Sequence, residues 1–255
     1  MSSTWGFKSP PPHHVKVLNS RIYSSNFFGF QRQPDKRTVQ GELEKGLHKI
    51  IREKVNLISS GRTDRGVHAV KQVSNFTTDS KIPADRLIYA LDNITPKDIK
   101  ILKVEDVDMK FHSRFSAKTR AYEFLLTPQR SVFETRYLTE VKEKIDVDKL
   151  YDIMRVFLGK HNFDGFRMTD CGGNNPIREI FEIRCYEKDN HKIGIYIEGN
   201  AFLKAQIRIM VGSSLAVYFN ERSYDYLLKK LENPNPKDEK IVVDGSGLYL
   251  YEINY

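Results

Sequence analysis

Helix-like and strand-like patterns alternate along this chain, and some strand-like segments follow one another without a helix between them. Residues 177–186 and 192–197 are rich in β-branched and aromatic side chains, and the polar turn KDNH separates them, so they predict an antiparallel pair. Residues 39–51 instead carry apolar side chains at helical spacing, after a candidate N-cap at Thr38. Strand pairs mixed with helices predict an α+β fold with an antiparallel or mixed sheet.

The same patterns divide the rest of the chain into elements. Further strands are predicted at 15–23, 55–58, 72–77, 99–103, 119–127 and 247–254, and further helices at 83–91, 146–158, 201–219 and 224–231. A charged, weakly patterned stretch at 128–145 predicts a boundary between two halves. We therefore expect a flexible tail at 1–14, an N-terminal half at 15–135 and a C-terminal half at 136–255.

The chain is basic, with 41 Lys and Arg against 33 Asp and Glu and a formal net charge of +8. This balance favours a polyanionic partner such as nucleic acid. The two cysteines, Cys171 and Cys185, have no zinc-ligand spacing, which favours a reduced intracellular protein without a structural metal or a disulfide framework. Lys204 and Arg208 interrupt the longest apolar stretch, 201–219, so no membrane span is predicted.

The segment SSGRTDRGVHAVKQVSNF, residues 59–76, is the most informative for chemistry. Asp64 lies between Arg62 and Arg65, and nearby glycines let the backbone approach a ligand closely. An ionised carboxylate in a basic groove can act as a nucleophile or a general base. An ordinary surface turn has the same local pattern, so these residues alone leave both interpretations open.

Two other segments carry candidate binding residues. Residues 111–124 interleave cations, among them Arg114 and Arg120, with aromatic side chains such as Phe111. This pattern can bind phosphates and stack on bases, and it is also typical of an amphipathic strand. In the apolar run 201–219, Arg208 needs either an anionic partner such as Asp64 or a path to solvent. Nucleotide-binding and metal-binding motifs are missing from the sequence, so neither a cofactor nor a metal is predicted.

Together these segments resemble the TruA family of tRNA pseudouridine synthases. GRTDRGVHA at 61–69 is similar to that family's catalytic loop, with an unusual arginine at 65. Further matches run in family order from about residue 15 to residue 255: FGFQRQPDKRTVQGELEKGL, FHSRFSAKTRAY, GKHNFDGFR, AFLKAQIRIMVG and GLYL. The resemblance implies two α/β halves around a central, mainly antiparallel mixed sheet, with a catalytic cleft between the halves.

The resemblance also implies roles for individual residues. Asp64 would start breakage of the base–ribose bond, by attack on the sugar, by attack on the base or by proton abstraction. Arg62 would help to extrude the target uridine, and Tyr122 would stack on the flipped base. Arg208 would pair with Asp64, and Leu248 would line the uracil pocket. Further substrate contacts are expected from Arg65, His68, Phe111, Arg114 and Arg120.

The function implied is that of a cofactor-free isomerase that forms pseudouridine in the anticodon stem-loop of tRNA, at positions 38–40, as a homodimer. The expected location is the cytoplasm, with an organelle as the other possibility. The chain departs from the family pattern at several positions, for example Ser24, Phe30 and Asn162. These departures leave open a paralogue that acts on rRNA or another tRNA site. A non-catalytic RNA-binding ribosome-assembly factor is a separate alternative, although the presence of Arg62, Asp64 and Tyr122 counts against it.

Overall fold

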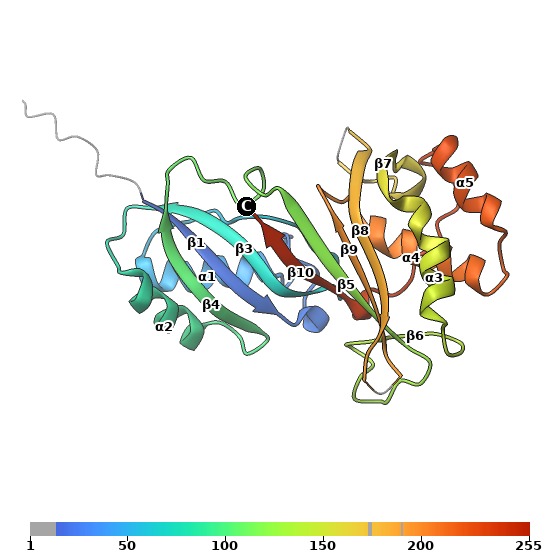
Figure 1. Ribbon diagram of the computed structural model, residues 1–255. Coiled ribbons are helices and arrows are strands. Elements are labelled where there is room, and N and C mark those ends of the chain that lie inside the picture. Colours follow the sequence, from blue (N-terminus) through green and yellow to red (C-terminus); the bar gives the residue numbers. More distant parts are fainter. Residues whose placement is uncertain (1–13, 173–174, 190) are drawn as a thin grey trace, which may run out of the picture.

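The computed structural model describes residues 14–172, 175–189 and 191–255 (Figure 1). The predicted tail at 1–14 lies outside these residues, apart from His14, which begins the first strand. Ten strands are found in the described residues: β1 (His14–Ile22), β2 (Ile58–Ser59), β3 (His68–Thr78), β4 (Ile99–Val107), β5 (Thr119–Thr127), β6 (Thr139–Glu140), β7 (Gly159–Asn162), β8 (Ile177–Glu187), β9 (Ile193–Gly199) and β10 (Leu248–Asn254). The same ranges hold five α-helices: α1 (Val39–Ile51), α2 (Ala84–Ile94), α3 (Val147–Met154), α4 (Gln206–Tyr218) and α5 (Tyr224–Glu232).

All ten described strands belong to one sheet, in the order β4-β1-β3-β10-β5-β9-β8-β7, with β2 paired to β3 and β6 paired to β5. The β3–β10 and β5–β6 pairs are parallel, and the other pairs are antiparallel. The prediction of an α+β fold with a mainly antiparallel mixed sheet is therefore confirmed.

The last strand in the sequence, β10, lies in the middle of the sheet, between β3 and β5 (Figure 1). Leu250 of β10 is paired with Ala69 of β3 on one side and with Tyr122 of β5 on the other. Because β10 bonds to a strand on each side, it joins the strands β4, β1 and β3 to the strands β5, β9, β8 and β7.

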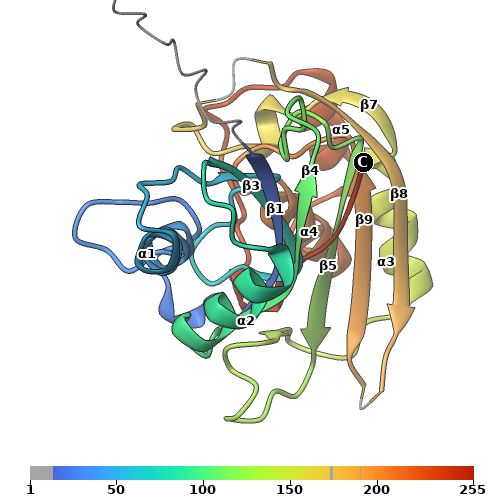
Figure 2. The ribbon, with the colours of Figure 1, turned by 90° about the vertical axis from the view of Figure 1, so that its left-hand side faces the viewer.

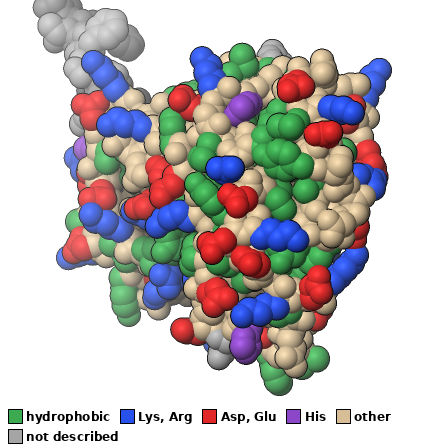
Figure 3. Space-filling model, turned by 45° about the vertical axis from the view of Figure 1, so that its right-hand side comes forward, with side chains coloured by type: hydrophobic (Ala, Val, Ile, Leu, Met, Phe, Trp, Pro, Cys, Tyr) green, Lys and Arg blue, Asp and Glu red, His purple; other side chains and the backbone are tan. Residues whose placement is uncertain are grey.

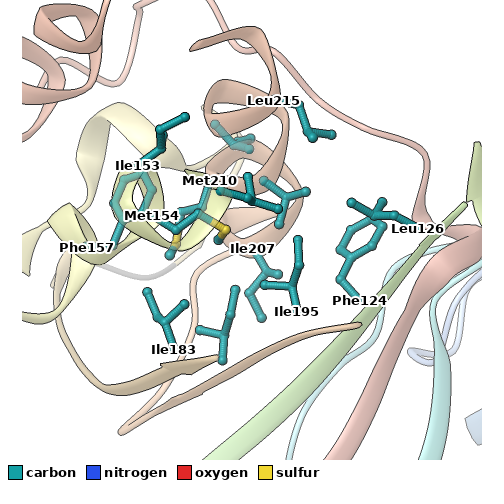
Figure 4. Close-up of a cluster of buried hydrophobic side chains, with 14 of the residues drawn as sticks. Phe124, Leu126, Ile153, Met154, Phe157, Ile183, Ile195, Ile207, Met210 and Leu215 are labelled. Atoms are coloured by element: carbon teal, nitrogen blue, oxygen red, sulfur yellow. The ribbon is translucent and has the colours of Figure 1, made fainter. Parts of the chain in front are cut away.

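Two hydrophobic cores flank this central strand. In Figures 1 and 2, α1 and α2 lie beside β1, β3 and β4, whereas α3 and α4 lie beside β8 and β9. The first core includes Leu18, Leu43, Leu47, Phe76, Leu87, Leu91, Leu250 and Ile253. The second core includes Phe124, Leu126, Met154, Phe157, Ile183, Ile195, Ile207 and Met210 (Figure 4). Leu248 also belongs to this second core.

Helix α1 forms where the sequence predicts it. The Thr38 hydroxyl accepts a hydrogen bond from Gly41 N at 3.3 Å, which satisfies one of the free amides of the first turn. Val39, Leu43 and Leu47 are fully buried, so the apolar stripe of the helix faces the first core. The cap and the hydrophobic spacing act together to fix this helix against the sheet.

Three predicted elements are shorter than expected. The helix predicted at 146–158 ends as α3 at Met154, and a 3₁₀ turn follows at Arg155–Phe157. The helix predicted at 201–219 begins only at Gln206, because Ala205 takes a left-handed φ of +57° and the Gln206 side chain accepts a hydrogen bond from Leu203 N at 2.8 Å. The strand predicted at 55–58 is reduced to β2, at Ile58–Ser59. In the described ranges, no helix has the combination of length and apolar character needed to cross a membrane.

Candidate active site

The segment 60–67 connects β2 to β3, and Gln72 of β3 holds its first residues. The fully buried Gln72 side chain accepts a hydrogen bond from Ser60 Oγ at 2.7 Å and donates to Gly61 O at 2.9 Å. The Ser60 amide also donates to Val73 O at 2.9 Å. These bonds fix the point at which the loop leaves the sheet.

Asp64 begins a tight turn that two glycines make possible. Val67 N donates to Asp64 O at 3.1 Å, and Gly66 takes a φ of +80° at the third turn position, where glycine is favoured. Gly29, with a φ of +88°, brings a second loop against the first: a Cβ there would lie 3.1 Å from Thr63 O. Phe30 N donates to the same carbonyl at 3.0 Å, so the backbone around Asp64 is fixed from two sides.

The Asp64 carboxylate pairs with Arg208, which comes from the first turn of α4. The distance from Arg208 Nη1 to Asp64 Oδ2 is 3.6 Å, and the two side chains are 22% and 26% exposed. Arg208 Nε donates to Val243 O at 2.9 Å, which orients the guanidinium. Arg208 in the apolar helix α4 therefore has an acidic partner, and the Asp64 carboxylate remains partly accessible to a ligand. The predicted pairing of Arg208 with Asp64 is present in the structure.

Tyr122 lies on β5 where the two cores meet, because its ring packs against both. The ring meets Phe202 edge to face, with centroids 5.2 Å apart, and a Cβ at Gly61 would lie 3.6 Å from the Tyr122 hydroxyl. Burial, and then the charge of Asp64, raise the pKa of Tyr122 well above 10.0. The phenol therefore stays protonated at neutral pH, and it offers a ring and a hydroxyl donor rather than a second base.

Leu248 begins β10 opposite Phe124 of β5 and is 4% exposed. It belongs to the second core, together with Val67, which closes the Asp64 turn. The structure therefore brings a buried apolar side chain and the Asp64 turn into one cluster.

Arg62 and Arg65 are exposed on either side of Asp64. The Arg65 guanidinium lies 4.7 Å from the centre of the Phe28 ring, and Lys36 Nζ lies 4.8 Å from the same centre. Arg62, Arg65 and Lys36 are all exposed, which suits a surface that binds a polyanion.

His68, predicted to contact substrate, is fully buried. Its Nδ1 accepts from Ser24 N at 3.0 Å, its Nε2 lies 2.8 Å from Arg136 O, and its ring stacks on Tyr249 with centroids 4.8 Å apart. Burial lowers the pKa of His68, so the ring is neutral, with its proton on Nε2. Both nitrogens are already engaged, so His68 ties β3 to the 3₁₀ turn at Ser24–Asn26 and to the loop before β6.

Phe111 and Arg120 also point into the protein. The Phe111 ring packs against the first core and lies 5.0 Å from the Tyr255 ring. Arg120 is 8% exposed and donates to four backbone carbonyls: Ser60 O at 3.2 Å, Ala117 O at 3.1 Å, Asn200 O at 2.8 Å and Arg114 O. Arg120 therefore clamps the backbone around the site. Neither placement supports the predicted contact with substrate.

Of the two arginines predicted to contact substrate from this segment, Arg114 reaches solvent and Arg120 does not. Beside it, Phe115 is 78% exposed, whereas Phe111 was the predicted aromatic contact. Gln72 was also missed as a residue that positions the loop. A polar glutamine within the otherwise β-rich run 72–77 was the signal that could have identified it, since a buried amide needs partners.

The described part of the chain contains no group of three or more His, Cys, Asp and Glu side chains that could hold a metal ion. The groups brought together at the site are a carboxylate, an arginine paired to it, a protonated tyrosine and two exposed arginines. This arrangement suits acid–base or nucleophilic chemistry on an anionic ligand with a planar ring.

Comparison with known proteins identifies the class as pseudouridine synthases. The chain matches a family described as tRNA pseudouridine synthase over residues 24–116 and 153–255. It is 36% identical over 240 residues to tRNA pseudouridine synthase A of Finegoldia magna, covering 93% of this chain and 98% of the relative. It is 34% identical over 233 residues to the protein of that name from Thermoanaerobacter sp. (strain X514), covering 91% and 95%.

A solved structure, the archaeal box H/ACA sRNP Nop10-Cbf5 complex, aligns with a TM-score of 0.37 and 12% identity over 80% of this chain and 43% of that chain. This likeness is too weak to support an argument. The sequence matches alone are sufficient: the chain belongs to the tRNA pseudouridine synthase family and is an RNA-modifying isomerase. They confirm the resemblance to the TruA family.

Proposed function

We propose that this enzyme forms pseudouridine in the anticodon stem-loop of tRNA, at positions 38–40, and that Asp64 is its catalytic carboxylate. The observation that carries the proposal is the 3.6 Å pair between Asp64 and Arg208, in a loop that matches the family's catalytic segment. The protonated ring of Tyr122 beside this pair supports a site for a planar base.

The reaction breaks the bond between uridine N1 and ribose C1′ and forms a bond from C5 to C1′. The hydrogen on C5 leaves as a proton, and N1 gains one, so atoms and electrons balance without a cofactor. Asp64 starts the reaction by attack on C1′, by attack on the ring or by removal of a proton, and the partly exposed carboxylate is compatible with each route.

A uridine inside a stem must leave its stack before it can meet Asp64, at a cost of a few kcal/mol. We assign the extrusion to Arg62, which is exposed two residues before Asp64. Tyr122 stacks on the flipped uracil, Leu248 contributes the apolar wall of its pocket, and Arg208 holds the carboxylate in place. Arg65 and Arg114, both exposed, contact phosphates.

The proposal includes a homodimer that acts in the cytoplasm. The support for both is the sequence match to the TruA family over more than 90% of this chain. Light scattering coupled to size-exclusion chromatography tests the assembly, and the expected mass is twice the 29.7 kDa of one chain.

The substrate is tested by mapping pseudouridine in RNA from cells with and without the gene. The proposal expects loss of modification at tRNA positions 38–40 when the gene is deleted, and recovery with wild-type protein but not with Asp64→Ala. Loss confined to rRNA or to another tRNA site would move the substrate and keep the chemistry. Full recovery of growth and function with Asp64→Ala would favour the non-catalytic assembly factor.

A further inference from the structure

A pocket of about 370 Å³ adjoins the Asp64 loop on the side of Arg62. Its volume lies at the lower end of the range of about 300–1,000 Å³ that is typical of small-ligand sites. Three segments of the chain meet there, and the lining residues with the relevant chemistry are Arg32, Gln40, Arg62, His112, Arg114 and Phe115. Asp64 itself is not part of the wall, so this pocket is separate from the place where the target uridine reacts.

One wall of the pocket is an aromatic ring held out in solvent. Phe115 is 78% exposed, and one side of its ring lies against His112, with centroids 4.3 Å apart and planes 31° apart. An exposed phenylalanine is costly to keep in water. The Arg114 guanidinium carbon also lies over this ring, 5.8 Å from its centre. An aromatic ring that is largely exposed and flanked by a cation suits stacking by an unpaired base.

The turn that carries Phe115 is rigidly anchored. Ser113, fully buried, accepts from the Tyr255 hydroxyl at its carbonyl, donates its amide to Asn75 Oδ1 at 2.8 Å and donates its hydroxyl to Ile58 O at 2.6 Å. Ser116 N closes the turn on His112 O at 2.8 Å, and Arg120 clamps it from below through Arg114 O and Ala117 O. The exposure of Phe115 is therefore built into the fold, and little ordering is needed when a base binds.

A second wall carries a guanidinium that is fixed in advance. Arg32 Nη1 pairs with Glu44 at 2.8 Å, and the Arg32 side chain remains 57% exposed while Glu44 is 8% exposed. Glu44 is itself held by Leu57 N at 3.0 Å and by Gln40 Nε2 at 2.9 Å. The buried carboxylate orients Arg32, whose side chain lines the pocket.

The charged side chains that line the pocket are all positive. Its described lining contains Arg32, Arg62 and Arg114 and no acidic residue. Elsewhere the charges are mixed: on the face shown in Figure 3, acidic and basic side chains lie interspersed. Three guanidinium groups around one exposed ring suit a phosphate joined to a planar base, because arginine matches phosphate geometry well.

We propose that this pocket binds the nucleotide next to the target uridine, with its base stacked on Phe115 and its phosphate between Arg32, Arg62 and Arg114. The inference rests on the proposed function, since it places the neighbour of the uridine that meets Asp64. Arg62 and Asp64 are two residues apart, at most about 7 Å along the backbone, so adjacent nucleotides of one strand reach both sites. The pocket then selects substrates whose target uridine has an unpaired or easily unstacked neighbour.

The test uses a stem-loop RNA that carries 2-aminopurine beside the target uridine, because stacking quenches the fluorescence of that base. Binding is measured in an Asp64→Asn background, so that no turnover occurs, and with Phe115, Phe115→Tyr, Phe115→Leu and Phe133→Leu. Phe133 is a matched control: it is 87% exposed on the loop before β6 and outside the pocket. The melting temperature of each variant is recorded to establish folding.

The proposal expects quenching with Phe115, with Phe115→Tyr and with Phe133→Leu. With Phe115→Leu, quenching is lost and Kd rises about tenfold, which corresponds to about 1.4 kcal/mol of stacking. A second variant, Arg32→Gln, lowers the salt dependence of binding by about one phosphate contact and keeps the quenching. Full quenching and unchanged affinity with Phe115→Leu would overturn the proposal.

Activity of the wild-type chain separates this inference from the proposed function. If wild-type protein forms pseudouridine at positions 38–40 while Phe115→Leu binds and quenches normally, the pocket assignment alone is wrong. If quenching depends on Phe115 while wild-type protein leaves those positions unmodified, the pocket stands as an RNA subsite and the substrate assignment is wrong.

Discussion

Replacement of Arg120 by methionine separates a structural arginine from one that binds RNA. Arg120 is 8% exposed and donates to four backbone carbonyls, which belong to Ser60, Arg114, Ala117 and Asn200. The sequence predicted that Arg120 contacts the substrate, because it lies in a segment that interleaves cations with aromatic side chains. Loss of a structural guanidinium lowers the free energy of unfolding, whereas loss of an RNA-binding guanidinium weakens the salt dependence of tRNA binding.

The magnitude follows from the hydrogen bonds. Each bond from a charged donor is worth about 1.5–3 kcal/mol, and an unpaired buried carbonyl costs about 1–3 kcal/mol. Part of this loss is offset, because burial lowers the pKa of Arg120 and so makes the cation itself expensive to bury. We expect Arg120→Met to lower the free energy of unfolding by about 2–4 kcal/mol, since the bonds do not add independently.

Urea unfolding followed by far-UV circular dichroism measures this change. Binding of tRNA over a range of KCl concentrations measures the number of phosphate contacts, because one contact changes the slope of log K against log salt by about 0.7–0.9. For Arg120→Met we expect a lower stability and an unchanged slope. The control is Arg114→Met, because the Arg114 side chain is exposed. For this variant we expect a smaller salt slope, and a free energy of unfolding within about 0.5 kcal/mol of wild type.

An Arg120→Met protein that unfolds at the wild-type urea midpoint and loses a full phosphate contact would refute the structural role of Arg120. That result would mean that the four carbonyl bonds contribute nothing to the fold and that the buried guanidinium reaches RNA.

Three further predictions concern residues that shape the site. Burial lowers the pKa of His68 below 6.5, so the unfolded chain binds more protons between the lowered pKa and about pH 6.5. The stabilisation is present above about pH 6.5 and is lost as pH falls through the lowered value; urea midpoints of His68→Asn should depend less on pH there, and an unchanged profile would contradict this. Gln72→Leu should lower stability by about 1–3 kcal/mol and reduce kcat more than KM, because Ser60 and Gly61 lose their anchor; an unaltered kcat in steady-state assays would exclude this role. Gly66→Ala should cost about 1–2 kcal/mol from its φ of +80° alone, because an added Cβ meets nothing within 4 Å; Gly66→Asn should cost less in thermal melts, and equal losses would argue against backbone strain.

The elements of the fold could be predicted because their patterns are local. The stripe of Val39, Leu43 and Leu47 and the cap at Thr38 are readable from a dozen residues, and α1 begins and ends at the bounds of the predicted range. The start of α4 could not be read, because it depends on the left-handed turn at Ala205 and on the contact of Gln206 with Leu203. The place of β10 depends on long-range pairing, which periodicity does not encode. The division into halves at 135 and 136 stays a prediction.

The pairing of two site residues was predicted, and the direction in which other side chains point was not. The carboxylate loop and the pairing of Asp64 with Arg208 could be expected, because a buried cation needs an acid and the motif supplied one. The sequence could not predict which side chains of residues 111–124 point outward. Their directions depend on a closed turn at residues 112–116, which precedes β5. That turn sends Phe115 and Arg114 to solvent and leaves Phe111 and Arg120 inside.

The most direct test of the central claim is tritium release from tRNA labelled with [5-³H]uridine, measured for wild type and Asp64→Asn side by side. The hydrogen on C5 is lost only when C5 becomes the new glycosidic carbon. We expect release by wild type and none by Asp64→Asn, with both proteins folded to the same thermal stability within about 1 kcal/mol, because Asp64 is partly exposed. Release at the wild-type rate by Asp64→Asn would contradict the assignment of Asp64 as the catalytic carboxylate.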